Sequence, residues 1–200
     1  MTRDKEWFLR KFPSAYHVTY RLNLQGIHHY GLMPANELKR TAGVVNQGLG
    51  FRATEMRIEH PQVGPILFRD QYPMRPEMLK LRKCLSGLEP KDWYRLVDDH
   101  IFFCLTPNAI DNLKNKYKDQ VVLRFDTHRL LELHEAAAHI TPINSGAVEP
   151  AYAPRGPQTF HPFTEWSRSG FMDKVRKRQP NPVELAFRLS CLKAEFQLCD

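Results

Sequence analysis

The fold is decided by the stretch Tyr16-His17-Val18-Thr19-Tyr20-Arg21-Leu22-Asn23-Leu24, which continues to Ile27 and Gly31-Leu32. Its first part predicts a strand over residues 15–20, because aromatic and β-branched side chains favour extended backbone. Its second part predicts a helix over residues 21–30, since Leu24, Ile27 and Tyr30 are spaced to share one face. Gly31 is placed to end that helix as a C-cap.

Outside this stretch, short strands and short helices follow one another along the chain. The pattern predicts helices at 4–12, 76–86, 90–97, 107–117 and 127–135, and strands at 65–68, 100–105, 120–125, 140–143 and 183–189. Residues 40–60 and 144–162 are expected to be mostly loop, the second stretch because it is rich in proline. This mixture is typical of an α+β domain rather than a doubly wound sheet.

Length and composition indicate one soluble domain. The chain has 200 residues, of which 42% are hydrophobic, so we expect residues 1–200 to form a single domain with its own core. No apolar run approaches the length of a membrane span, and the charged N-terminus has no apolar segment behind it. We therefore expect a cytoplasmic protein without a membrane partner.

The net charge of +7 favours an anionic partner such as a dinucleotide or nucleic acid, although a basic soluble protein would also show it.

Metal and disulfide chemistry are not expected. The four cysteines form no CxxC pair and are interpreted as reduced thiols. His134 and His139 flank an acidic residue as in zinc proteases, but they are five residues apart instead of four. At about 100° per residue they would point to different sides of a helix, so no metal site is predicted.

Six further segments join the opening stretch in a resemblance to the DarT-like ADP-ribosyltransferases. They are Ile66-Leu67-Phe68-Arg69-Asp70-Gln71-Tyr72-Pro73-Met74, Asp92-Trp93-Tyr94-Arg95-Leu96, His100-Ile101-Phe102-Phe103, Val122-Leu123-Arg124-Phe125-Asp126-Thr127, Asn144-Ser145-Gly146 and Pro182-Val183-Glu184-Leu185-Ala186-Phe187. They occur in the family's order over residues 15–190 and are similar to a bacterial branch catalogued as a domain of unknown function. The resemblance implies an ADP-ribosyltransferase-like fold, with two small packed β-sheets and flanking short helices.

The resemblance also implies a reaction and its residues. NAD would be the substrate; Glu184 and Arg69 would be catalytic, and His17, Thr19 and Asn23 would bind NAD. The residue types suit the chemistry, because breaking the nicotinamide–ribose bond develops positive charge that a carboxylate stabilises. An arginine fork suits a phosphate, and a histidine suits ribose hydroxyls.

Each of these residues also has an ordinary structural interpretation. His17 would be a core histidine, Thr19 a plain strand residue, Asn23 a helix cap, Arg69 a surface partner of Asp70, and Glu184 a solvent-facing carboxylate. Glu149, in the proline-rich stretch, is the rival of Glu184 for the catalytic role.

The acceptor implied by the resemblance is a base in single-stranded DNA. Two basic clusters suit phosphate contacts of that kind, the first formed by Lys80, Arg82 and Lys83 and the second by Lys174, Arg176, Lys177 and Arg178. A toxin of this kind would also have an antitoxin or immunity partner, which the sequence does not identify. Two alternatives stay open: a non-catalytic nucleic-acid-binding module on the same fold, and an enzyme like the RNA 2′-phosphotransferases.

Overall fold

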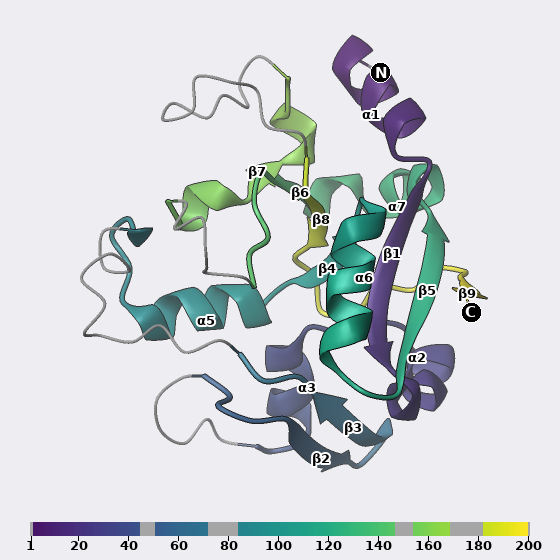
Figure 1. Ribbon diagram of the computed structural model, residues 1–200, viewed down its shortest axis with the longest axis vertical. Coiled ribbons are helices and arrows are strands. Elements are labelled where there is room, and N and C mark those ends of the chain that lie inside the picture. The colour runs from purple at the N-terminus through teal and green to yellow at the C-terminus, as the bar shows by residue number, and fades with distance from the viewer. Residues whose placement is uncertain (1, 45–50, 72–83, 147–153, 169–181, 200) are drawn as a thin grey trace.

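A computed structural model describes residues 2–44, 51–71, 84–146, 154–168 and 182–199 (Figure 1). Its α-helices are α1 (Arg3–Lys11), α2 (Leu24–Tyr30), α3 (Ala35–Thr41), α5 (Pro90–Asp98), α6 (Pro107–Lys116) and α7 (Thr127–His134). Its strands are β1 (Ser14–Tyr20), β2 (Met56–His60), β3 (Gly64–Phe68), β4 (Ile101–Cys104), β5 (Gln120–Asp126), β6 (Ala138–Thr141), β7 (His161–Pro162), β8 (Glu184–Phe187) and β9 (Gln197–Cys199). The α+β class predicted from the sequence agrees with this mixture of elements.

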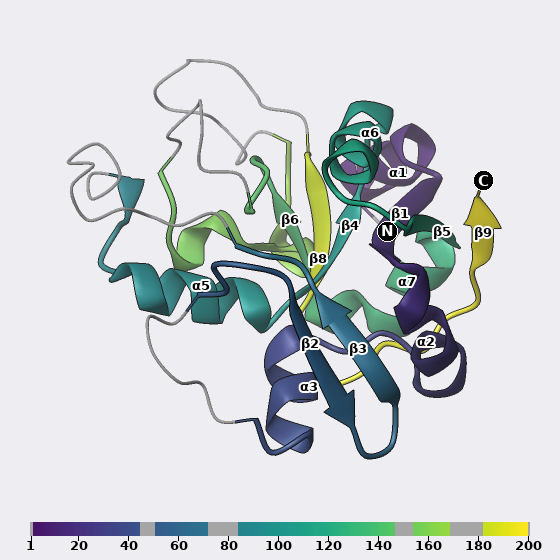
Figure 2. The same ribbon diagram turned by 60° about the horizontal axis from the view of Figure 1, so that its bottom comes forward.

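The strands form one large sheet and one hairpin. The large sheet has seven antiparallel strands in the order β7-β6-β8-β4-β1-β5-β9, so β1 lies between β4 and β5. β2 and β3 pair separately as a two-stranded hairpin, which lies below the large sheet in Figure 1 and comes to the front in Figure 2. The expectation of two small packed sheets is therefore corrected to one seven-stranded sheet with an added hairpin.

Three separate groups of apolar side chains hold these parts together. The main core packs Phe103, Leu123 and Phe187 of the large sheet against Phe8 of α1 and Leu130 of α7. A second group centres on Trp93 and Tyr94 of α5 with Phe160 and Ala186. The third joins Ile58, Ile66 and Phe68 of the hairpin to Ala35 and Leu38 of α3. The hairpin thus packs on α3 in a core of its own.

Local sequence explains several helix ends. Thr2 caps α1 by accepting from the Lys5 amide, and Asp126 caps α7 by accepting from the Arg129 amide. Pro90 occupies the first turn of α5, where its missing amide costs nothing. Gly31 ends α2 with φ +85°, and a Cβ there would lie 2.5 Å from the Leu192 carbonyl oxygen.

Several regular elements were not predicted from the sequence. Residues 40–60 include the end of α3 and all of β2, where a loop was expected, β7 lies in the loop expected at 144–162, and nothing was predicted at β9. In β2 the buried Ile58 and His60 alternate with the exposed Arg57 and Glu59, so the strand is regular although its apolar residues are only Met56 and Ile58. The predicted helix at 76–86 falls mostly outside the described residues. In the part of the chain that the structure describes, no helix is long and apolar enough to cross a membrane.

Candidate functional site

The large sheet opens between β1 and β4. The strand β1 pairs along its other side with β5 over all seven residues, from Ser14↔Asp126 to Tyr20↔Gln120. With β4 it forms the single pair Tyr16↔Cys104. Continuing that antiparallel register would set Val18 opposite Phe102, yet their carbonyl groups bond to side chains instead. A cavity of about 270 Å³ lies along this opening and is lined by both strands.

His17 supplies a hydrogen-bond donor to a carbonyl group of β4 at the opening. Its Nδ1 lies 2.9 Å from the Phe102 carbonyl oxygen. Since a carbonyl can only accept, Nδ1 carries the proton. Burial lowers the pKa of His17 to about 4, although the Phe102 bond opposes the shift. The neutral ring therefore keeps a lone pair on Nε2, and His17 lines the cavity.

Arg69 supplies a hydrogen-bond donor to a carbonyl group of β1 at the opening. It follows β3 directly, and its guanidinium donates from Nη2 to the Val18 carbonyl and from Nε to the Gln120 side chain, 3.2 Å away. Asp70 instead contacts the Tyr117 hydroxyl, so the surface pair between Arg69 and Asp70 does not form. Within the described chain the Nη1 group of Arg69 has no acceptor. It is available to a ligand in the cavity that Arg69 lines.

Asn23 fastens the hairpin to β1. Its Nδ2 donates to the Thr19 hydroxyl and to the Leu67 carbonyl, each at 3.0 Å, and its Oδ1 accepts from the Leu67 amide at 2.9 Å. Asn23 occupies the N-cap position of α2, but its side chain makes no capping bond to that helix. Both amide hydrogens and one lone pair of Oδ1 bond to Thr19 and Leu67, which gives Asn23 a structural task. Direct contact of Thr19 or Asn23 with NAD stays a prediction.

Glu184 is a buried carboxylate at the start of β8. It is 8% exposed, so the solvent-facing interpretation is wrong. Its Oε2 accepts from the Thr141 hydroxyl at 3.0 Å and from the Ser145 amide at 3.1 Å, and the same Thr141 hydroxyl lies 2.7 Å from the Ile143 carbonyl. Burial raises the pKa of Glu184 to about 7, against the opposing effect of these donors and of Arg155.

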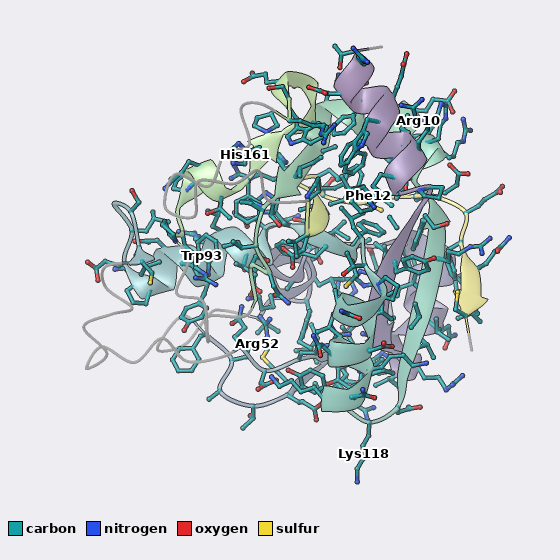
Figure 3. All side chains as sticks on the ribbon, turned by 45° about the horizontal axis from the view of Figure 1, so that its top comes forward. Arg10, Phe12, Arg52, Trp93, Lys118 and His161 are labelled. Carbon is teal, nitrogen blue, oxygen red and sulfur yellow. The ribbon has the colours of Figure 1, made fainter. Side chains whose placement is uncertain are left out.

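Asp98 is a second buried carboxylate in the cavity wall, at the end of α5. It accepts from Lys39 Nζ at 2.7 Å, from Nη1 and Nη2 of Arg52, the latter at 3.1 Å, and from Gln71 Nε2 at 2.9 Å. Arg52 also donates from Nε to the Arg69 carbonyl at 2.8 Å. In Figure 3 Arg52 lies in the middle of the molecule, whereas Arg10 and Lys118 lie at its periphery. Asp98, at the end of α5, thus bonds to α3 and to the two segments that lead into and out of the hairpin.

The cavity brings together residues that are far apart in the sequence. The predicted residues His17, Thr19, Asn23, Arg69 and Glu184 all line it. Their chemical roles stay predictions. The basic clusters Lys80, Arg82, Lys83 and Lys174, Arg176, Lys177, Arg178 lie outside the described residues, as does Glu149.

Arg52, Asp98 and Lys39 were not predicted as site residues, because no motif contains them. Arg52 lies in a stretch expected to be loop, and Asp98 lies one residue beyond the helix expected at 90–97. The described residues contain no group of three or more His, Cys, Asp or Glu side chains placed to hold a metal. Cys104 lines the cavity, but burial raises the pKa of its thiol to about 12, which is unsuited to a nucleophile.

Comparison with known proteins gives one family and one solved structure. A structure described as Thermus sp. 2.9 DarT in complex with NAD+ is similar with a TM-score of 0.36 and 13% sequence identity, covering 88% of this chain and 77% of that chain. No curated protein matches. The profile of a family of unknown function, DUF7002, matches residues 13–195, which is most of the chain. The protein is therefore a member of the DUF7002 family.

Proposed function

We propose that this protein is an NAD-dependent ADP-ribosyltransferase, which breaks the nicotinamide–ribose bond and transfers ADP-ribose to an acceptor. One observation carries the proposal. His17, Arg69 and Glu184 come from three distant segments that resemble the DarT-like enzymes, and all three line the cavity at the opening of the sheet.

The chemistry assigned to Glu184 follows from its surroundings. When nicotinamide leaves with the bonding electron pair, the ribose carbon becomes positively charged. An ionised carboxylate beside it, held by Thr141 and Ser145, stabilises that charge without having to reorganise. The positive nicotinamide ring of bound NAD favours the ionised form of a carboxyl whose pKa is already about 7. The same carboxylate then accepts the proton that the acceptor loses.

His17 and Arg69 would position the substrate. The lone pair on Nε2 of His17 accepts from a ribose hydroxyl. The Nη1 group of Arg69 donates to a phosphate oxygen, while its other nitrogens stay bonded to β1 and Gln120. A cavity of about 270 Å³ is large enough for part of NAD, such as the nicotinamide riboside end.

The acceptor we propose is a base in single-stranded DNA. The net charge of +7 and the basic clusters at residues 80–83 and 174–178 support a polyanionic acceptor. Binding to single-stranded DNA should weaken with salt, and neutralising one phosphate contact should reduce the slope of log affinity against log salt by roughly 0.7. Measuring that slope for wild type and for charge-reversed variants of each cluster tests this part separately.

The central test is to incubate the purified protein with NAD and measure free nicotinamide by chromatography. Mass spectrometry of single-stranded DNA, RNA and protein from the same mixture then identifies the acceptor by its added ADP-ribose. Binding of nucleic acid without nicotinamide release would favour the non-catalytic module. Loss of an RNA 2′-phosphate in the presence of NAD would favour the phosphotransferase.

A further inference from the structure

Lys39, Arg52 and Asp98 place an unequal number of charges beside the cavity. Two cations contact one carboxylate, and the remaining partner of Asp98, the Gln71 amide, is neutral. Both Lys39 and Asp98 are buried, and Arg52 and Asp98 line the cavity. Because buried charge is costly unless it is matched, a surplus positive charge at a cavity wall indicates an anionic ligand.

The acidic residues nearest in sequence are engaged elsewhere, Glu37 among them, which accepts from Arg40. Asp99 accepts from Asn36 at 2.7 Å and lies 3.6 Å from Arg188. Glu55 contacts the Tyr20 hydroxyl. Among the described residues, therefore, none of these carboxylates joins the cluster of Lys39, Arg52 and Asp98 to balance it.

Arg52 is also held in a fixed orientation. Asp98 binds Nη1 and Nη2, and the Arg69 carbonyl accepts from Nε. A guanidinium has five N–H groups, so two remain after these three bonds. The bond to the Arg69 carbonyl connects Arg52 to the segment that carries Arg69, and both arginines line the cavity. Two preorganised arginines in one cavity are suited to a group with two neighbouring phosphates.

We propose that Arg52, oriented by Asp98, binds the diphosphate of a nucleotide ligand in the cavity together with Arg69. This inference rests on the proposed function, in which that ligand is NAD. It adds a second arginine to the site and assigns Asp98 a positioning role.

Calorimetric titration of ADP and of adenosine tests the proposal, because the two ligands differ only in the diphosphate. Arg52→Met should weaken ADP binding about 10- to 100-fold, the usual effect of losing hydrogen bonds to a charged group. Its adenosine affinity should stay that of wild type. The matched control is Arg57→Met, on the same hairpin, where Arg57 is exposed and pairs with Glu59. This control should bind both ligands like wild type.

Equal losses of ADP and adenosine affinity in Arg52→Met, or equal ADP losses in the two methionine variants, would overturn the proposal. If Arg52→Met does not fold, a second measurement on the wild-type protein decides. Inorganic diphosphate should then displace ADP, because both ligands would occupy the diphosphate site. Failure to displace it would equally overturn the proposal. ADP binding through Arg52 without nicotinamide release from NAD would retain the diphosphate site and refute the proposed reaction. If the wild-type protein releases nicotinamide and Arg52→Met binds ADP normally, the proposed reaction is retained and the diphosphate site is refuted.

Discussion

Asp98 and Glu184 are both buried carboxylates in the wall of one cavity, and they are 5% and 8% exposed. Their partners differ in charge. Asp98 is bonded to the cations Lys39 and Arg52, whereas Glu184 is bonded to a hydroxyl and a backbone amide. Arg155 acts on Glu184 electrostatically without reversing the rise of its pKa to about 7.

This difference separates a carboxylate that holds the fold from one suited to chemistry. Removing Asp98 would leave two cations unmatched where four segments meet. Removing the charge of Glu184 would leave the donors of Thr141 and Ser145, from which the oxygen of a glutamine side chain can still accept. A raised pKa in a cavity is typical of a residue kept for function at some cost to stability.

The largest effect is expected from Asp98→Asn. Breaking a buried charge pair by removing one partner typically costs about 3–5 kcal/mol of unfolding free energy. Urea unfolding of wild type and variant measures it. The control is Asp119→Asn, which alters an exposed pair with Arg21 and should change stability by less than about 0.5 kcal/mol. Similar losses in the two variants would show that Asp98 is no more structural than a surface acid.

Glu184→Gln should lower the rate of nicotinamide release by about 10²–10³, the scale for losing one preorganised electrostatic group. NAD affinity should fall much less, because the charge matters mainly in the transition state. At pH 8 the melting temperature should equal or exceed that of wild type, since the ionised form of Glu184 is disfavoured in the fold. Glu149→Gln, at the rival position, should stay active; the opposite pattern would move the catalytic role to Glu149.

The pH dependence should follow ionisation of Glu184. The mechanism requires the carboxylate, so kcat/KM should rise with a midpoint near pH 7 and increase roughly tenfold from pH 6 to pH 8. Stability should change in the opposite sense. A pKa raised above that of the unfolded chain stabilises the fold at low pH, and this stabilisation is lost as the pH rises through about 7. A flat kinetic profile in wild type would contradict the assignment, and Glu184→Gln should give one.

Thr141→Val should have the smallest effect. Valine keeps the shape but removes the hydroxyl that donates to Glu184, so the pKa of Glu184 should rise further. The midpoint of the kinetic profile should move upward by about one pH unit or less, with little change in the rate at high pH. The double variant with Glu184→Gln should show no midpoint at all. A downward movement would mean that Thr141 does not favour the ionised carboxylate.

The sequence predicted the elements around the cavity better than the connections between them. The strand at 15–20, the helix ended by Gly31 and the strand containing Glu184 agree with β1, α2 and β8, because each has a strong local pattern. The order of the seven strands followed from no local pattern. Pairing between distant strands is set by tertiary contacts, which a single sequence does not display.

Individual residues show the same limit. Asn23 was expected to contact NAD or cap a helix, and its bonds to Leu67 require a strand that lies 44 residues further along the chain. The importance of Asp98 depends on Lys39, Arg52 and Gln71, which come from three other segments. A motif identifies residues whose role depends on their neighbours in the sequence. Asn23 and Asp98 instead depend on partners that are distant in the sequence and that the fold brings close.

Thr141 couples the charge of Glu184 to the chain that follows β6. Its hydroxyl has one hydrogen, yet both the Ile143 carbonyl and the Glu184 carboxylate lie within bonding distance. When Glu184 is ionised, that hydrogen turns to the carboxylate and the Ile143 carbonyl loses its donor. When Glu184 takes up a proton, it donates to Thr141, and the hydroxyl turns back to Ile143. Each change in the protonation of Glu184 thus reverses one hydroxyl and reaches Ile143, the residue that precedes the proline-rich stretch.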